Sequence, residues 1–464
     1  MTTTNPTPAA LGLESLAATV RGPVLAGDDP RAADEITTFN LAVTHRPAVV
    51  VGATSADDVA AAVSWSVERR LPVAVQSTGH GPVRGADGAV LVTTSRMQSV
   101  TVDPVRRTAT VAAGARWADV VAATAPHGLA PLSGSSSQVG VVGYTLGGGM
   151  GSLAREHGFA ADHVHRVELV TADGRVRRVD EHSDPDLFWA VRGGKGNFGI
   201  VTSLEFGLVP VSEIYGGSVF FAGGSASAVL HAFRTWAPTL PEQATTSVAL
   251  MRMPPLEELP EMLRGQFVVA LRFAFTGDPD EGQSLLAPML AAGEVLIAGV
   301  GPMPYSQADM IHQDPTEPMP VWERGRLLRE LPEEAVETLL AVAGPDVDIP
   351  LALVEMRLMG GAMARQPRVP NAVSGRDAAF TLFMVGPLFP GLEEAVPAVG
   401  SAVLDAMTPW LTGTGQLNFL GDALTPEAVA VAWAPEAHRR LLGVKARVDP
   451  DNVFCHGHAL VARA

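Results

Sequence analysis

The glycine- and serine-rich segment 131–158, PLSGSSSQVGVVGYTLGGGMGSLAREHG, restricts the fold of this chain more than any other stretch. Glycine has no side chain to pack and loses much conformational freedom when it is ordered. A flexible linker is one interpretation, but the apolar residues Val139, Val141, Val142 and Leu146 are not typical of linkers. Because glycine lets backbone N–H groups approach phosphate oxygens closely, we predict that this segment lies against a bound ligand.

A second feature is a histidine between two glycines, in VAVQSTGHGPVRG at residues 73–85. The patterns of 48–53 and 71–76 are typical of strands, and 55–69 has the pattern of an amphipathic helix with Ser55 as its N-cap. This order favours a βαβ unit, in which ligands bind beyond the carboxyl ends of the strands. The loop of His80 follows such an end, and its own residues have little bulk to hold the ring. We therefore expect another group to occupy the space around His80.

The second half of the chain has a different composition. At 464 residues, two or three domains are expected. From about Ser212 prolines cluster, methionines become frequent, and strand-like runs occur at 244–253, 266–275, 350–359 and 378–386. These runs favour an antiparallel sheet with helices on one face, inserted as a second domain. The predicted fold class is therefore α+β.

Charge and composition exclude several kinds of partner. The net charge of −16 repels a phosphate backbone, so nucleic acid is not predicted as a partner. Cys455 is the only cysteine, which excludes an intrachain disulfide. Because we find neither a secretory signal pattern nor an apolar window of about 18 residues, we expect a soluble, cytoplasmic protein with no membrane partner. The pairs His163/His165 and His456/His458 lack a carboxylate or thiolate in ligand spacing, so no metal is predicted.

The segment GGKGNFGIVTSLEF contains the G-x-G-x-x-G spacing of a dinucleotide fingerprint, at Gly194, Gly196 and Gly199. That fingerprint must open a helix, whereas the residues after Gly199 are β-branched and strand-like. We therefore reject a nicotinamide-binding Rossmann fold, although this turn can still contact a ligand.

Five segments carry a resemblance to a known family: AVQSTGHGP, SSSQVGVVGYTLGGGMGSLAREHGFAADHV, LVTADGRV, DLFWAVRGGKGNFGIVTSLEF and VKARVDPDNVF. In this order they resemble the berberine bridge enzyme-like branch of the vanillyl-alcohol oxidase/p-cresol methylhydroxylase (PCMH) flavoprotein superfamily, in the style of its bacterial oxidases. The resemblance implies a PCMH-type FAD-binding domain of two subdomains over 1–211. It also implies a substrate domain, with an antiparallel sheet flanked by helices, over 212–410, and a C-terminal segment, 411–464, that returns to the FAD domain.

The resemblance implies FAD as the cofactor. In the family, the histidine at the position of His80 is bonded covalently to the 8α carbon of the flavin, and a neutral imidazole is a suitable nucleophile for that bond. A histidine that only contacts FAD is the alternative. Members with a second covalent link use a cysteine where this chain has Ser136, so no cysteinyl link is implied. The residues assigned to the cofactor are His80, Gln76, Ser77, Thr78, Gly79, Gly81, Ser136, Gly140, Val141, Gly143, Tyr144, Gly148, Gly199, Ile200, Val201, Asn452 and His458.

The catalytic groups are expected to differ from those of family oxidases that rely on a tyrosine, because this chain has Phe419 at that position. Alternation in the run 350–359 places Glu355 and Arg357 on one face, and the resemblance places such a strand over the flavin. We interpret Glu355 as a candidate base whose pKa is raised by partial burial, with a solvated ion pair as the alternative. The candidate substrate residues are Met251, Arg252, Met253 and Arg272, for which core packing or an ordinary sheet surface is the alternative.

The function that the resemblance implies is that of an FAD-dependent oxidase. It would transfer hydride from a hydrophobic small molecule, of the secondary-metabolite kind, to flavin N5 and reduce O2 to H2O2. One alternative is a flavin-dependent oxygenase or cyclase that acts on a reactive polyketide-like intermediate. Another is a flavin-binding protein without catalytic activity. The expected partners are a small-molecule substrate and molecular oxygen, and the expected oligomeric state is a monomer or a homodimer.

Overall fold

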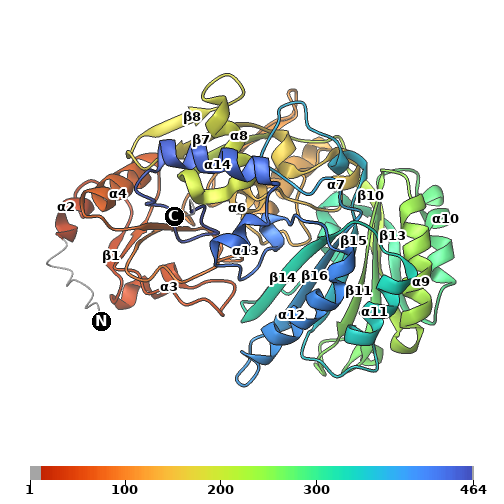
Figure 1. Ribbon diagram of the computed structural model, residues 1–464. Coiled ribbons are helices and arrows are strands. Elements are labelled where there is room, and N and C mark those ends of the chain that lie inside the picture. The colour runs from red at the N-terminus through yellow and green to blue at the C-terminus, as the bar shows by residue number, and fades with distance from the viewer. Residues whose placement is uncertain (1–11, 462–464) are drawn as a thin grey trace.

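The computed structural model describes residues 12–461, which form three β-sheets with helices packed against them (Figure 1). The α+β class predicted from the sequence is confirmed. Within the described residues, no helix is long and apolar enough to cross a membrane.

The first sheet has four strands in the order β1 (Val24–Ala26), β2 (Val49–Gly52), β4 (Val90–Thr93) and β3 (Val73–Gln76). β2 and β3 both run parallel to β4, which lies between them, and β1 is antiparallel to β2. The predicted crossover helix is α4 (Ala56–Glu68), and the Ser55 hydroxyl accepts a hydrogen bond from the backbone N–H of Asp58 at 3.2 Å. The loop of His80 begins where β3 ends. The short helices α2 (Leu13–Ala17) and α3 (Ala33–Ile36) lie in the chain before this unit.

The second sheet is antiparallel and has the order β5 (Val100–Asp103), β6 (Thr108–Ala112), β9 (Ile200–Gly207), β7 (Val164–Val170) and β8 (Val176–Val179). Its core includes Trp117, Phe188 and Phe198. The glycine-rich segment is ordered beside this core and contains two short helices. The helices of this region are α5 (Trp117–Thr124), α6 (Val141–Leu146), α7 (Ala154–His157) and α8 (Pro185–Gly194).

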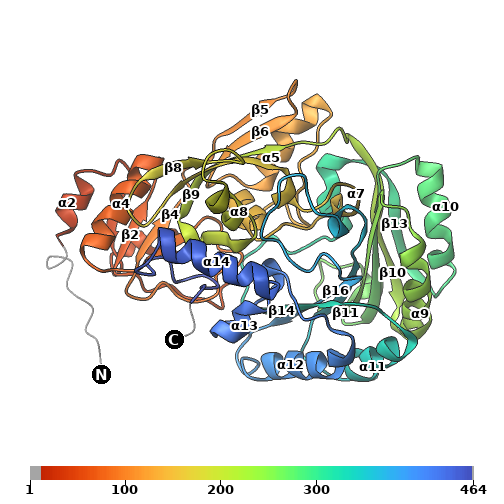
Figure 2. The same cartoon turned by 45° about the horizontal axis from the view of Figure 1, so that its top comes forward.

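The third sheet is antiparallel and has seven strands in the order β13 (Val295–Pro304), β10 (Glu213–Ala222), β12 (Phe267–Phe275), β11 (Ala244–Arg252), β15 (Leu353–Leu358), β16 (Phe380–Pro387) and β14 (Val321–Leu328). The four strand-like runs predicted from the sequence are β11, β12, β15 and β16, whereas β10, β13 and β14 were not predicted. One face of this sheet forms a core with four helices, which lie along the outer edge of the molecule (Figure 2). These are α9 (Ala226–Trp236), α10 (Pro279–Leu290), α11 (Glu333–Ala343) and α12 (Ala395–Met407).

The C-terminal segment packs against the first half of the chain through α13 (Pro426–Ala430) and α14 (Pro435–Val448). α14 lies over α8 in Figure 1. Beyond it, the backbone N–H of Val73 donates to the carbonyl of Val453 at 2.9 Å. The domain divisions at 211 and 410 stay predictions, and all strands of the third sheet lie within 213–387.

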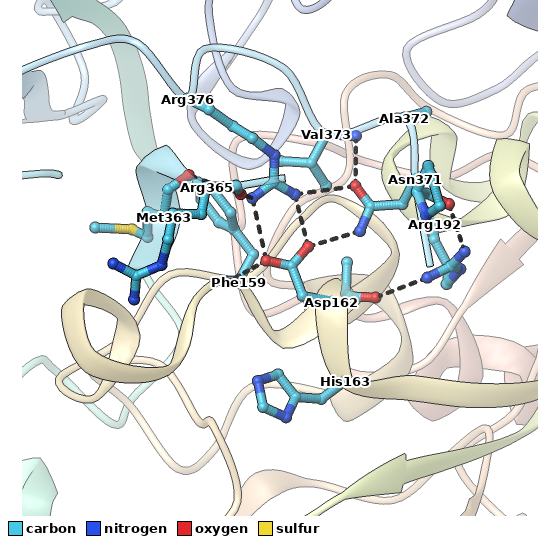
Figure 3. Close-up of polar contacts among 12 residues, drawn as sticks. Phe159, Asp162, His163, Arg192, Met363, Arg365, Asn371, Ala372, Val373 and Arg376 are labelled. Carbon is cyan, nitrogen blue, oxygen red and sulfur yellow. Dashed lines mark hydrogen bonds and ion pairs between the residues drawn. The ribbon is translucent and has the colours of Figure 1, made fainter. Parts of the chain in front are cut away.

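A buried polar cluster joins the loop between β15 and β16 to the turn at 160–163 (Figure 3). Arg376 Nη2 lies 2.6 Å from Asp162 Oδ1, and both side chains are at most 7% exposed. Asn371 Nδ2 donates to the same carboxylate at 2.6 Å. The fully buried Arg192 guanidinium donates to the carbonyl of Pro370 at 2.7 Å and packs over the Phe188 ring. This cluster therefore fixes the third sheet relative to the second.

We predict that Arg376→Met lowers the free energy of unfolding by about 3–5 kcal/mol, because it leaves the Asp162 carboxylate buried without its cation. Arg365→Met is a matched control in the same loop, since Arg365 pairs with Glu242 at the surface, with both side chains at least 45% exposed. The free energy of unfolding of that variant should fall by less than about 1 kcal/mol. Urea unfolding of both variants measures the difference, and equal losses would contradict a role for the buried pair.

Candidate functional site

A cavity of about 550 Å³ lies between the first two sheets and the third, within the range of small-molecule and cofactor sites. Loops of the first half and the C-terminal segment form one part of its wall. Strands β14, β15 and β16 form another part. The wall draws on the segments 73–84, 134–150, 195–201, 312–323, 353–357, 383–385, 418–419 and 454–458.

The His80 ring is held by a residue distant in sequence. It stacks on Phe39, with ring centroids 3.9 Å apart and planes at 10°, which fills part of the space that the sequence left open. Nδ1 lies 2.8 Å from the Thr78 hydroxyl oxygen, and Nε2 is buried without a hydrogen-bond partner in residues 12–461. Burial, together with the Arg116 guanidinium, lowers the pKa of His80 to about 4. The ring is therefore a neutral imidazole at pH 7, with one nitrogen unpaired.

The backbone of this loop requires glycine at Gly79, where φ is +71° and a Cβ would lie 2.7 Å from Thr38 Cα. Gly81 and Gly143 differ, since a Cβ at either position would meet no described heavy atom within 4 Å. Both line the cavity, so the main chain there faces open space. The other residues assigned to the cofactor that line the cavity are Gln76, Ser77, Thr78, Ser136, Gly140, Tyr144, Gly199, Val201 and His458.

Four residues assigned to the cofactor lie away from the cavity wall. Val141 is the fully buried first residue of α6, and Ile200 packs in the core of the first sheet. Gly148 lies against Val373, and Asn452 occupies the turn after α14. None of the four lines this cavity, and their assignment to the cofactor stays a prediction.

The C-terminal segment contributes two further unpaired ring nitrogens. His458 Nε2 donates to the carbonyl of Gly421 at 2.8 Å, which leaves Nδ1 as a buried acceptor without a partner in the described chain. Burial, and then the charge of Lys195, lower the pKa of His458 to about 4. His456 Nδ1 donates to the carbonyl of Gly85 at 3.2 Å, and its Nε2 is likewise unpaired within residues 12–461. Arg84, which the sequence analysis did not single out, also lines the cavity with its Nε buried and unpaired.

Glu355 and Arg357 lie on the cavity face of β15, as the alternation predicted, while Val354 and Met356 face the helical core. The Glu355 carboxylate is 1% exposed. Its Oε1 accepts hydrogen bonds from Arg272 Nη1 and the Ser247 hydroxyl, and its Oε2 from Arg357 Nε, all at 2.7 Å.

The prediction of a raised pKa for Glu355 is wrong. Burial alone raises the pKa of this carboxyl group, but the charges of Arg357 and Arg272, together with His312, outweigh it and hold the pKa well below its usual range. Glu355 is therefore a permanent anion whose oxygens are already engaged, and it is poorly suited to accept a proton.

Of the four candidate substrate residues, Arg272 alone lines the cavity within residues 12–461. Arg252 lies on the opposite face of β11, where its Nη2 donates to the carbonyls of Ala343, Gly344 and Val347 at 2.8–3.2 Å. Met251 Sδ lies 3.7 Å from Arg272 Nη2. Met253 follows the end of β11. Arg252 is therefore held by backbone carbonyls on the other face of the sheet, whereas a role of Met251 and Met253 in substrate binding stays a prediction.

Sequence reasoning missed a lysine and a carboxylate on the wall. Lys195 has φ +53° and ψ −146°, a backbone conformation that favours glycine. Burial lowers the pKa of Lys195 to about 8, against the effect of Glu323. Glu323 lies on β14, and burial raises the pKa of its carboxyl group to about 7, against the effect of Lys195. A charged residue within the glycine-rich stretch GGKGNFG could have indicated Lys195 as a site residue. Glu323 could not be found in the same way, because its strand was not predicted.

No group of three or more His, Cys, Asp or Glu residues that could hold a metal ion occurs in the part of the chain that the structure describes. The wall contains neutral imidazole rings, backbone that faces open space, and buried hydrogen-bond donors.

The sequence is similar to known FAD-linked proteins, which agrees with a cavity of cofactor size. Residues 47–180 match the family described as FAD binding domain, and residues 417–460 match the family described as berberine and berberine like. The chain is 28% identical over 440 residues to (R)-6-hydroxynicotine oxidase of Paenarthrobacter nicotinovorans, covering 89% of this chain and 91% of that protein. It is 27% identical over 454 residues to an uncharacterized FAD-linked oxidoreductase of Bacillus subtilis (strain 168), covering 93% and 95%.

Among solved structures, the fold is similar to that of 6-hydroxy-D-nicotine oxidase from Arthrobacter nicotinovorans. The TM-score is 0.81 at 25% identity, over 95% of this chain and 98% of that chain. The fold and the site together define an FAD-linked oxidoreductase. Within that class, the chain combines an FAD binding domain with a C-terminal segment that matches the berberine and berberine like family, and so resembles the berberine bridge enzyme-like flavoproteins.

The residues present fit FAD. A large polar cofactor needs donors and acceptors that the protein itself leaves unpaired, and buried polar groups normally have partners. Ser77 Oγ, His80 Nε2, Arg84 Nε, His456 Nε2 and His458 Nδ1 are all buried on the wall without a partner in residues 12–461. The open backbone at Gly81 and Gly143 gives room for close approach.

Proposed function

We propose that this protein is an FAD-dependent oxidase of a hydrophobic small molecule, of the secondary-metabolite kind. The observation that carries the proposal is the division of the cavity wall. Unpaired polar atoms that suit FAD come from the loops and the C-terminal segment, and the third sheet contributes an apolar and charged surface for a substrate. When bound, FAD supplies the redox chemistry, accepting a hydride at flavin N5 and passing two electrons to O2. The substrate loses a hydride and a proton, and O2 with two protons becomes H2O2.

The proposed role of His80 is to hold the flavin through a covalent bond to its 8α carbon. Its neutral state supports this role, because an unprotonated imidazole nitrogen is the nucleophile. Its stack on Phe39 fixes the ring plane, and the unpaired Nε2 shows that the ring has bonding capacity to spare within the described chain. Ser136 lies on the same wall and has no thiol, so we propose a single link.

We predict that acid-precipitated wild-type protein keeps its yellow colour and flavin fluorescence after washing, and that His80→Ala protein loses both. His456→Ala is a matched control, since it removes another neutral, half-unpaired imidazole from the wall and should leave the colour in the pellet. Release of flavin from the wild type on precipitation would refute the covalent link while leaving FAD binding intact.

The proposed role of Glu323 is to accept the substrate proton. It lies on the same face of the third sheet as Glu355, because Glu323 and Leu353 both pair with Val385 and Leu353 lies two residues before Glu355. Unlike Glu355, its carboxylate has no hydrogen bond to any described residue. A pKa of about 7 also suits a general base near neutral pH.

We predict that Glu323→Gln slows anaerobic reduction of the flavin by substrate about 100- to 10,000-fold, as expected for loss of a general base. In the wild type, kcat/KM should fall as the pH drops through about 7, because Glu323 becomes protonated there. The variant should lack this acid limb. Asp314→Asn, which changes another carboxylate on the wall, should retain it. An acid limb that persists in Glu323→Gln would assign the proton to another group.

The test of the oxidase reaction itself is the fate of oxygen. We expect one H2O2 per product molecule and no label in the product when turnover is run under ¹⁸O2. Label in the product would instead support the flavin-dependent oxygenase or cyclase. Oxidised flavin that no candidate substrate reduces would support a binding protein without catalytic activity.

A further inference from the structure

The charged cluster on the cavity face of the third sheet contains more positive than negative charges. Two guanidinium groups, of Arg272 and Arg357, contact one carboxylate, that of Glu355. The exposed fractions of these side chains are 4%, 15% and 1%, so the cluster is shielded from bulk water. The three groups that contact one another directly have a net charge of +1. A buried net charge is costly unless it has a counterion, which indicates that something else pairs with it.

No ionisable group other than Glu355 forms a direct ion pair with Arg357 or Arg272 within the described chain. Burial, and then Arg357 and Arg272, lower the pKa of His312 to about 3, so this ring is neutral at pH 7. Asp314 lines the cavity and attracts Arg357 electrostatically, but it forms no ion pair with Arg357 or Arg272 within the described chain. Tyr144 stays protonated, since burial raises its pKa well above the usual value.

Arg357 is the member of the cluster with donors to spare. Its Nε bonds Glu355 Oε2, whereas its Nη1 and Nη2 make no hydrogen bond to any residue in 12–461. Both Nη atoms of Arg272 already have partners, because Nη1 donates to Glu355 Oε1 and Nη2 lies against Met251 Sδ. The pair of free Nη donors on a planar guanidinium matches the two oxygens of a carboxylate. The Glu355 and Arg272 side chains hold that guanidinium in place.

The surface beside Arg357 is aromatic and apolar. The rings of Phe383 and Phe419 meet edge to face with centroids 5.0 Å apart, and the Arg357 guanidinium lies 5.6 Å from the Phe419 centroid. Leu353 and Val385 line the cavity next to them. Such a wall favours a flat, conjugated ligand body over a polyhydroxylated one.

We propose that the substrate of this site is a conjugated, largely apolar molecule that carries an oxyanion, either a carboxylate or a comparably acidic enol or phenol, which binds the Nη atoms of Arg357. This inference rests on the proposed oxidase function and specifies its substrate class. Arg357 is then a specificity-determining residue. Arg272 and Glu355 are positioning residues that act through it.

The test uses three pairs of flat probes that differ only in charge: benzoate and benzamide, 2-naphthoate and 2-naphthamide, and anthracene-2-carboxylate with its amide. Binding to the flavin-loaded protein is measured by the change in the flavin absorbance spectrum and by calorimetry, without turnover. In the wild type, we expect the acid of at least one pair to bind more tightly than its amide. In Arg357→Gln, that preference should fall about 10- to 100-fold, the worth of a charge-assisted hydrogen bond, while the amide binds as before.

Two further variants separate recognition from folding. Arg357→Lys keeps the charge without the paired donors and should recover part of the preference. Arg252→Gln removes a partly buried arginine from the other face of the same sheet and should keep the full preference. Flavin content and melting temperature, measured for every variant, show whether each one folds.

Equal binding of acid and amide by the wild type, an unchanged preference in Arg357→Gln, or failure of all three acids to bind would each overturn the inference. Failure of the oxidase proposal is distinguishable, because it would appear as flavin that no substrate reduces while the acids still bind. Conversely, the protein could oxidise neutral substrates and bind the acid and the amide of each pair equally well. That result would support the oxidase function and refute the proposed oxyanion on the substrate.

Discussion

The buried contact between Asp162 and Arg376 is the interaction on which the geometry of the cavity depends. One wall of the cavity comes from loops of the first two sheets, and the facing wall comes from the third sheet, so their relative position sets its shape. Arg376 reaches Asp162 from the loop between β15 and β16, two adjacent strands of the facing wall. Arg155, from α7, donates to the carbonyls of Met359 and Pro241 at 3.0 Å and makes a second such contact. Buried guanidinium groups with several carbonyl acceptors are directional, which makes them better positioning devices than apolar packing alone.

Two carboxylates on one sheet face show how strongly surroundings control acidity. Glu355 and Glu323 share the cavity face of the third sheet, yet the pKa of one is held low and that of the other is raised. Two guanidinium groups contact Glu355 directly. Glu323 has burial without such a contact, and Lys195 acts on it only at longer range. The site therefore separates a fixed anion from a carboxyl group that can change its proton near neutral pH, a separation typical of sites that handle protons.

Local patterns predicted local structure well in this chain. The N-cap at Ser55, the strand β9 after Gly199, and the inward face of β15 followed from periodicity and side-chain chemistry. Contacts between distant segments were not predictable in the same way. The sequence around Glu355 does not contain Arg272, which lies 83 residues earlier and reaches it only through the strand register. The same reason explains the wrong pKa and the missed stack of Phe39 on His80. β14 was missed because WERGR interrupts the apolar alternation of that strand.

The C-terminal segment has a consequence for the order in which the molecule matures. His456 contacts the carbonyl of Gly85, 371 residues earlier in the chain, and residues 454–458 close one side of the cavity. During synthesis on the ribosome, the loop of His80 emerges long before that closing segment, and contacts of such sequence separation form late. A nascent chain that lacks residues 454–458 therefore has a cavity that is open on that side. Retention of the cofactor is therefore expected to depend on the docking of residues 454–458, which contain no helix or strand, so that flavin content reports whether this segment has docked.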